Sequence, residues 1–388
     1  MTQQTLGFTL CDWQQAYQQE GLAPAAVLGA LRNELSTDDN AWISLASEAQ
    51  LNEQLAALDE RLQQVEGNVA SLPLYGVPFA VKDNIDAAGW DTTAACPAFA
   101  HQASADATVV ARLRAAGAIL IGKTNLDQFA TGLVGTRSPY GAVSNSFNAD
   151  YVSGGSSSGS ASVVARGLVP FALGTDTAGS GRVPAGFNNI VGLKPTRGWL
   201  SNTGLVPACR TLDCISVFAL TVADAQAVAT IAGGFDPSDA YSRANPCSAP
   251  VGLPVRPKLA IPANPEFFDD TQMQTAYEAA LEKWRAFGAE LVEIDFSPFA
   301  DLAAQLYQGS WVAERTVAVG DMDPDKMDPV VRGIVEGGHK YSACEAYQAE
   351  YIRAELSRQI NLILADFDAL LVPTSPTIRR ISEMAEEP

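Results

Sequence analysis

Apolar positions near the start of the chain recur at helical spacing. Between residues 12 and 65 they lie three or four positions apart, as at Leu51, Leu55 and Leu58. This period places the apolar side chains on one face of a helix. We therefore expect residues 1–70 to form a helical segment that packs on the core of the protein and that could also offer a dimer surface.

Further along the chain, helical and strand patterns alternate. Residues 107–116 have helical spacing and precede a short apolar run at residues 118–121, and residues 271–287 and 291–295 repeat this order. Alternation of this kind is typical of a mixed or largely parallel sheet covered by helices. No linker-like run divides the middle of the chain, so we expect one large α/β body over residues 71–388.

Charge and cysteine spacing exclude several classes of protein. The net charge is −19 and no cluster of Lys and Arg occurs, so we expect no nucleic-acid partner. The N-terminus lacks a signal sequence and no long charge-free apolar run follows it, so we expect a cytoplasmic protein without a membrane segment. The six cysteines are irregularly spaced, and Cys209 and Cys214 lack the further ligands of a zinc site. We expect reduced thiols, no metal and no cofactor.

Two segments rich in glycine and serine contain the candidate nucleophiles. Ser156 lies in SGGSSSGSA, and Ser180 lies in GTDTAGSGR. A serine needs a base to become a nucleophile. The chain has only two histidines, His101 and His339, and neither lies in such a segment. A Ser-His-Asp triad is therefore poorly supplied, and the base must be of another kind.

Lysine is the natural alternative base. Lys82 ends the apolar run GVPFAV and precedes a polar turn, so we expect it on a buried strand. Desolvation of a lysine lowers its pKa and lets it accept a proton. Residues 161–166 predict a short helix and residues 169–173 a buried strand, which returns the second serine segment to the same end of the sheet as the first.

The segment before the second serine also predicts an oxyanion hole. Thr177, Ala178, Gly179 and Ser180 offer successive backbone N–H groups with little side-chain obstruction. The alternative for such a loop is a flexible linker or a phosphate cradle. The letters of a P-loop do occur at residues 117–124, as GAILIGKT, but the residues between the two glycines are apolar and predict a strand rather than exposed amides.

Taken together, the Lys82 strand and the two segments GGSSxGS and GTDTxGS resemble the amidase signature family over residues 72–374. The resemblance implies the amidase-signature fold. It also implies that Ser180 is the acylated nucleophile, that Ser156 is a relay serine on a cis peptide after Gly155, and that Lys82 is the base. Such an enzyme forms an acyl-enzyme, releases ammonia or an amine, and is deacylated by water.

Three features are similar to the allophanate hydrolase branch of that family. They are residues 131–141, residues 209–214, and the pair Ala178 and Gly181, where the family usually has Gly and Ile. We expect the last two differences to change the acyl pocket. The branch hydrolyses the terminal amide of allophanate, a small urea-like anion, to ammonia and N-carboxycarbamate, in urea or cyanurate breakdown.

The resemblance further implies three substrate-binding residues. Tyr307 and Arg315 match the pair that holds the substrate carboxylate, and Gly132 would bring a backbone group to the substrate. If residues 306–315 form one helix, Tyr307, Trp311 and Arg315 share a face. An ordinary amphipathic helix with a paired arginine explains this spacing as well. Because the chain is strongly acidic, specificity for an anion has to come from a local cation.

The expected partners follow from this resemblance. We expect a small anionic amide as substrate, a homodimer, and a functional link to a biotin-dependent urea carboxylase. Alternatives are the amidase subunit of a tRNA-dependent amidotransferase, another small-amide amidase, and a non-catalytic binding module on an amidase fold. Residues 367–374 resemble a late strand of the family core, after which the family adds further core segments. We therefore expect a fragment of a longer protein or a core completed in another way.

Overall fold

The chain divides into two compact units. The computed structural model describes residues 6–244 and 252–387. The first unit comprises Met1–Asn245, Asp321–Arg332 and Arg379–Pro388, and the second unit comprises Pro246–Gly320 and Gly333–Ile378. The sequence predicted one body after residue 70, and the compact units instead divide near residue 245.

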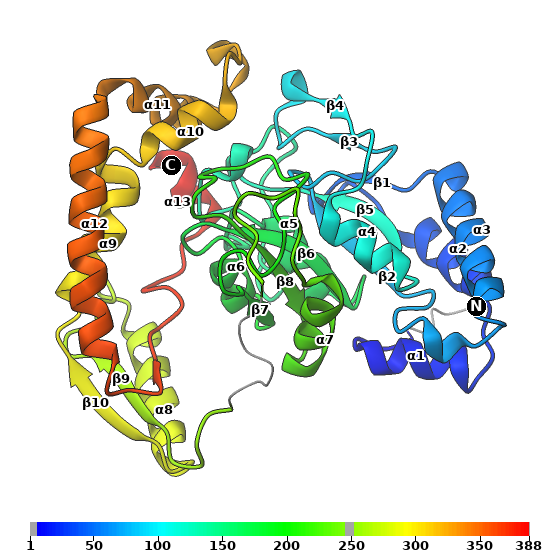
Figure 1. Cartoon of the computed structure of the whole chain (residues 1–388), viewed down its shortest axis with the longest axis horizontal. Helices are drawn as coiled ribbons and strands as arrows, with labels where there is room; N and C mark the ends of the chain where they lie inside the picture. Colours follow the sequence, from blue (N-terminus) through cyan, green and yellow to red (C-terminus); the bar gives the residue numbers. More distant parts are fainter. Residues whose placement is uncertain (1–5, 245–251, 388) are drawn as a thin grey trace. The chain divides into compact units, whose positions relative to one another are not determined.

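A six-stranded mixed sheet forms the centre of the first unit, in the order β1-β5-β2-β6-β8-β7 (Figure 1). β2 is parallel to β5 and β6, whereas β1 is antiparallel to β5 and β8 is antiparallel to β6 and β7. The predicted α/β class with a mixed sheet is confirmed. The strands are β1 (Trp42–Leu45), β2 (Pro78–Lys82), β5 (Ile119–Thr124), β6 (Phe171–Asp176), β7 (Val191–Leu193) and β8 (Cys214–Ala219). A separate ribbon pairs β3 (Asp91–Thr92) with β4 (His101–Gln102).

The four inner strands of this sheet are buried along their whole length. Every residue of β2, β5, β6 and β8 is buried, as expected for strands covered by helices on both faces. Phe79 and Phe171 stack on neighbouring strands with ring centroids 5.4 Å apart. The helices of the first unit are α1 (Leu10–Gln18), α2 (Pro24–Glu34), α3 (Glu48–Gln64), α4 (Thr108–Ala115), α5 (Ser158–Ala165), α6 (Arg182–Phe187), α7 (Val222–Ala232) and α13 (Ile381–Glu386). Short 3-10 turns are η1 (Val69–Ser71), η2 (Pro97–Phe99), η3 (Gln128–Ala130) and η4 (Pro324–Lys326).

The N-terminal segment is part of this core. The predicted helices occur as α1, α2 and α3, and Leu51 and Leu58 of α3 are buried. The purely helical prediction for residues 1–70 missed β1, which pairs with β5 at the edge of the sheet. Only four residues form this strand, which is too short for an alternating pattern to stand out from the helical spacing around it.

The second unit has a smaller, parallel sheet in the order β10-β9-β11. The predicted order of a helix followed by a strand occurs as α8 and β10. The elements are β9 (Lys258–Pro262), α8 (Thr271–Ala286), β10 (Glu290–Ile294), α9 (Ser297–Gln308), α10 (Val312–Val319), η5 (Gly338–Lys340), α12 (Ala343–Leu364) and β11 (Ala369–Leu370). Helix α11 (Pro329–Gly337) contains residues of both units. The expected late strand at residues 367–374 is only the two residues of β11.

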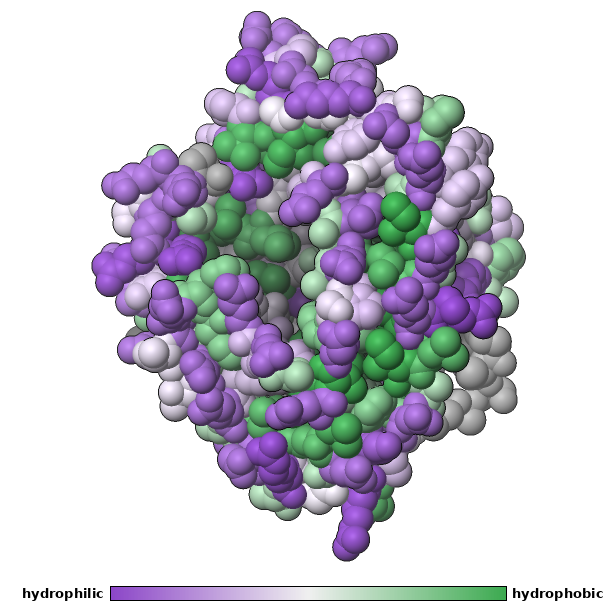
Figure 2. Space-filling model, turned by 90° about the vertical axis from the view of Figure 1, so that its left-hand side faces the viewer, coloured by the Kyte–Doolittle hydropathy of each residue, from purple (hydrophilic) through white to green (hydrophobic). Residues whose placement is uncertain are grey.

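The long helix α12 leaves apolar side chains at the surface. Ala349 is its one buried residue, and Tyr347, Tyr351 and Leu362 are each about two-thirds exposed, at 67, 65 and 67%. Figure 2 shows the face of the molecule that includes this helix, where apolar patches lie between hydrophilic side chains. Among the described helices, none is both long and apolar enough to cross a membrane.

Candidate active site

The structure brings the predicted base to the first predicted serine. Lys82 is the last residue of β2 and is fully buried, and its Nζ lies 2.7 Å from the Oγ of Ser156. The same Nζ lies 2.6 Å from the Oγ1 of Thr175 on the neighbouring strand β6. Lys82 is therefore held between two hydroxyl groups in a site closed to solvent.

Sequence reasoning missed Thr175. The signal was present, because Thr175 stands within the GTDTAGSGR segment and one residue before the end of β6. Interpreted as a loop residue, it had no predicted partner. Once β6 is placed beside β2, its hydroxyl lies within hydrogen-bonding distance of the lysine amine.

Ser156 lies on the predicted cis peptide. The bond between Gly155 and Ser156 is cis, and Ser156 is fully buried just before α5. The second predicted serine, Ser180, is also buried and precedes α6. The two serine loops are joined through their backbones, since the N–H of Ser157 donates to the carbonyl of Ser180 at 3.3 Å.

An internal ion pair fixes the loop that contains Ser180. The Nε and Nη2 of Arg182 each donate to the carboxylate of Asp176 at 2.9 Å, and the N–H groups of Gly179 and Gly181 donate to the same carboxylate. Burial alone would raise the pKa of Asp176, but Arg182 and these amides outweigh it and hold the pKa below its ordinary value. An ionised Asp176 therefore pins both flanks of the nucleophile loop.

This network affects the predicted oxyanion hole. The N–H of Gly179 points to Oδ1 of Asp176 at 2.8 Å and is occupied in this structure. Thr177, Ala178 and Ser180 are the remaining candidates from the predicted set of four. The Oγ1 of Thr177 donates to Asp213 at 2.5 Å, so a neighbouring loop also holds the start of the segment.

Packing explains why the residue after the proposed nucleophile, Gly181, is a glycine. A Cβ built on Gly181 would lie 2.7 Å from the Oγ of Ser216 on β8. The space beside Gly181 is thus filled by Ser216. A close approach between loop and strand therefore requires glycine at this position, and its effect on the acyl pocket stays a prediction.

The P-loop-like letters belong to a buried strand, as predicted. β5 continues through Gly122 to Thr124, and Lys123 is fully buried. Its Nζ lies 3.1 Å from the carboxylate of Asp83. Burial raises the pKa of Asp83, and the charge of Lys123 opposes this. Lys123 is engaged in this ion pair next to the Lys82 strand and is not placed to hold a phosphate.

In the second unit, the side chains of Tyr307 and Arg315 contact each other. The Nη2 of Arg315 donates to the hydroxyl of Tyr307 at 3.0 Å, and its guanidinium carbon lies 5.0 Å from the centre of the tyrosine ring. Arg315 is 2% exposed and Tyr307 is 42% exposed. The arginine is therefore desolvated while the tyrosine edge is open to a ligand.

The single helix expected over residues 306–315 is wrong. α9 ends at Gln308, Gly309 adopts an extended conformation, and α10 begins at Val312. Trp311 caps α10. Glycine has a low helix propensity, which favours a break at this position. Tyr307 and Arg315 meet across this break instead of along one helical face.

Gly132 follows the short turn η3, in a loop of the first unit that also contains Arg137. The Nη1 of Arg137 donates to the carbonyl of Thr131 at 3.2 Å and closes this loop. A Cβ on Gly132 would lie 2.6 Å from Oδ2 of Asp127. The backbone at Gly132 is therefore pressed against a buried carboxylate.

Other features of the described residues do not join this site. His101 lies 3.2 Å from Asp86 in an exposed pair, and His339 belongs to η5 of the second unit. No group of acidic, cysteine or histidine side chains in residues 6–244 and 252–387 could hold a metal ion. Five cysteines in these residues form no disulfide, and Cys247 lies outside them.

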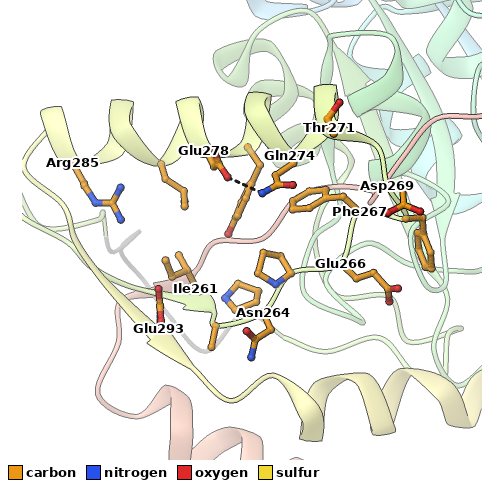
Figure 3. Close-up of a pocket in the computed structure, with 16 residues that line it drawn as sticks. Ile261, Asn264, Glu266, Phe267, Asp269, Thr271, Gln274, Glu278, Arg285 and Glu293 are labelled. Atoms are coloured by element: carbon orange, nitrogen blue, oxygen red, sulfur yellow. Dashed lines mark hydrogen bonds between the residues drawn. The ribbon is translucent and has the colours of Figure 1, made fainter.

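A large cavity in the second unit is separate from the predicted residues. It has a volume of about 820 Å³ and lies between α8 and the segment that follows β9 (Figure 3). Its lining includes Glu266, Gln274, Glu278 and Arg285, but neither Tyr307 nor Arg315. This cavity is therefore not the site of the lysine and serines.

A buried lysine bonded to a serine, with a second serine on the adjacent loop, is the type of site used by serine hydrolases that lack a histidine base. The family model described as Amidase matches residues 30–385. The chain belongs to the amidase family.

Individual relatives differ in how much of their length the chain covers. It is 47% identical, over 99% of its residues, to a urea amidolyase of Saccharomyces cerevisiae, of which it spans 21%. It is 33% identical over 96% of its residues to a glutamyl-tRNA(Gln) amidotransferase subunit of Koribacter versatilis, of which it spans 84%. Among solved structures it is similar to an allophanate hydrolase of Kluyveromyces lactis, with a TM-score of 0.94 and 46% identity over 99% of this chain and 63% of that one.

Proposed function

We propose that this chain is an amidohydrolase that hydrolyses the terminal amide of allophanate to ammonia and N-carboxycarbamate. The observation that carries the proposal is the likeness, over 99% of the chain, to the allophanate hydrolase of Kluyveromyces lactis. The urea amidolyase relative supports the same chemistry. The chain spans about a fifth of the length of that relative. That this chain by itself hydrolyses allophanate is therefore part of the proposal.

The hydrogen bond between Lys82 and Ser156 supports a proton relay. Neutral Lys82 takes the proton of Ser156, and Ser156 takes the proton of Ser180 as the oxygen of Ser180 attacks the terminal amide carbon. The relay then runs backwards and protonates the leaving nitrogen, which departs as ammonia. A water molecule attacks the acyl-enzyme by the same route and releases N-carboxycarbamate, which then loses carbon dioxide.

The backbone before the nucleophile supplies the oxyanion hole in this proposal. The N–H groups of Thr177, Ala178 and Ser180 hold the developing negative charge. Gly179, the fourth predicted donor, contributes only if its N–H leaves Asp176, to which it now donates. Asp176 and Arg182 keep the loop in place and do not touch substrate.

We assign the carboxylate of allophanate to Tyr307 and Arg315. The buried guanidinium of Arg315 and the tyrosine hydroxyl that it contacts at 3.0 Å form a charged and a neutral donor side by side. Such donors bind a carboxylate well because charge-assisted hydrogen bonds strengthen when water is excluded. Gly132 offers a backbone group to the remaining part of the substrate.

The partners follow from the substrate. Allophanate is a carboxylated urea, so the reaction that supplies it is a urea carboxylation, and we propose a functional link to a biotin-dependent urea carboxylase. We also propose that the chain is a homodimer, which sedimentation of the purified chain measures directly. In the coupled assay, urea, bicarbonate and ATP should yield ammonia only when the carboxylase is present.

Ammonia release from allophanate tests the function, with malonamide, glutamine and biuret as competing substrates and Ser180→Ala as the inactive control. Turnover confined to allophanate is the expected result. The likeness to the amidotransferase subunit makes glutamine the competing substrate of interest. Preferential release of ammonia from glutamine would overturn the proposal in favour of that activity.

A further inference from the structure

Asp127 is a fully buried carboxylate around which a loop of the first unit is folded. It follows β5, and its oxygens accept the backbone N–H groups of Val134 at 3.1 Å, Gly135 at 2.9 and 3.0 Å, and Arg137 at 3.1 Å. Three amides of one loop thus converge on a single side chain. The conformation of residues 131–137, which include Gly132, depends on this convergence.

The backbone of the same residue holds the relay serine. The N–H of Asp127 donates to the carbonyl of Ser156 at 3.1 Å. A Cβ on Gly155 would overlap Oδ2 of Asp127, and one on Gly132 would lie 2.6 Å from it. The carboxylate of Asp127 therefore fills the space between the loop of residues 131–137 and the cis peptide. Only glycine fits at the two positions that contact it, Gly132 and Gly155.

The charge state of Asp127 fits this role. Both oxygens accept N–H groups, which is the pattern of an ionised carboxylate. Burial raises the pKa of Asp127, and the amides of Gly135 and Arg137 oppose that effect. Arg137 further closes the loop through its bond to the carbonyl of Thr131.

We propose that Asp127 is a positioning residue for the reaction, since it sets the loop of Gly132 and the backbone of Ser156 relative to each other. The inference rests on the proposed function, in which Gly132 contacts substrate and Ser156 relays a proton. Asp127 itself touches neither substrate nor Ser180. An error of about 1 Å in the geometry of reacting groups costs on the order of 100-fold in rate, so loosening this contact should be visible in kinetics.

The variant Asp127→Asn keeps the size of the side chain and removes half of its acceptors. An amide has one oxygen, and its NH₂ group would face one of the three N–H donors. Two measurements are made on protein shown to be folded by circular dichroism. The first is kcat and KM with allophanate, and the second is the rate at which a fluorophosphonate probe modifies Ser180 with loss of fluoride. We expect kcat to fall about 100-fold and the modification rate about 10-fold.

Asp236→Asn is the matched control, because Asp236 is also a buried aspartate of the first unit. It accepts several hydrogen bonds, none of them from Ser156 or Ser180. The substitution should lower the melting temperature while kcat and the modification rate stay within about twofold of the unmodified enzyme. Folded Asp127→Asn protein with both rates within that same range would overturn the proposal.

Arg137→Ala tests the loop if Asp127→Asn does not fold. It removes the closing bond and leaves Asp127 in place, so KM should rise about 10-fold while the modification rate of Ser180 is unchanged. An unchanged KM would then overturn the proposal.

If the unmodified chain reacts with the probe but releases no ammonia from allophanate, the proposed function fails, and the modification rates still decide the role of Asp127.

Discussion

The two units differ in how completely they bury the residues that the proposed reaction uses. In the first unit, Lys82 and Thr175 lie on strands in which every residue is buried, and Ser156 is itself fully buried. In the second unit, Arg315 is buried, but Tyr307 is 42% exposed and the long helix α12 has one buried residue among the described ones. Proton transfer needs groups fixed to within a fraction of an ångström. Binding a carboxylate tolerates larger movements of the side chains that hold it.

The largest effect should come from the buried base. Lys82→Ala removes the proposed base and should lower kcat by about 10⁴-fold or more, while Lys326→Ala, a change in a 3-10 turn of the same unit, should leave it unchanged. Ammonia release from allophanate measures both. Retention of more than about 1% of kcat in folded Lys82→Ala protein would show that another group serves as the base.

The next largest effect should be a difference between the two units in how much stability a core substitution removes. Phe171→Ala opens a cavity beside Phe79 in the sheet of the first unit, and this should lower the free energy of unfolding by about 3–5 kcal/mol. Phe267→Ala in the second unit should cost less, since its cluster consists of Ile261, Tyr277 and Leu281, each of which keeps some exposure and can relax. Urea denaturation gives the free energies, and hydrogen exchange assigns them to each unit. Equal losses of unfolding free energy in the two variants would show that the two cores do not differ in this way.

The sequence predicted elements best where the local pattern and the tertiary environment agree. The helices α4 and α8 and the strand β5 have strong periodic or continuous apolar patterns, and each was predicted within a few residues. β1 and the break at Gly309 were missed. β1 depends on a tertiary contact, because β5 offers the edge with which it pairs. The break was present in the sequence as Gly309, but the spacing of Tyr307, Trp311 and Arg315 favoured one continuous helix.

The same division holds for the site. The glycine- and serine-rich segments and Lys82 could be found because their chemistry is unusual for a chain with two histidines. Thr175 and Asp127 could not, because a threonine in a strand and an aspartate after a strand are common, and their roles appear only when β2, β5 and β6 lie side by side. The pairing of Gly179 with Asp176 was equally invisible, since it depends on the path of one backbone amide.

A smaller kinetic effect is expected at the carboxylate pair of the second unit. Tyr307→Phe keeps the ring under the guanidinium and removes one donor, so KM for allophanate should rise about 10-fold with little change in kcat. Malonamide has no carboxylate, and its KM should not change. If the KM values of both substrates rose equally, the tyrosine would serve the fold of the site and not recognition of the carboxylate.

The smallest effect is a stabilisation that should be lost only in acid, and it again contrasts the units. Asp236 of the first unit accepts the hydroxyls of Thr108, Ser201 and Thr203 at 2.6, 2.6 and 3.0 Å. The hydrogen bonds of Ser201 and Thr108 hold the pKa of Asp236 well below its ordinary value. The bonds of Ser342 likewise lower the pKa of Glu345 in the second unit, but that pair is exposed.

A lowered pKa in the folded state means that the unfolded chain binds the proton more readily. The stabilisation by Asp236 is therefore complete above the ordinary pKa of about 3.9 and is lost as the pH falls below it. The difference in melting temperature between the unmodified chain and Asp236→Asn should shrink between about pH 5 and pH 3. Glu345→Gln should show almost no such dependence, because water replaces the bonds of an exposed carboxylate. A difference for Asp236→Asn that stays constant over this range would mean that the three hydroxyls stabilise the fold through packing and not through the charge they surround.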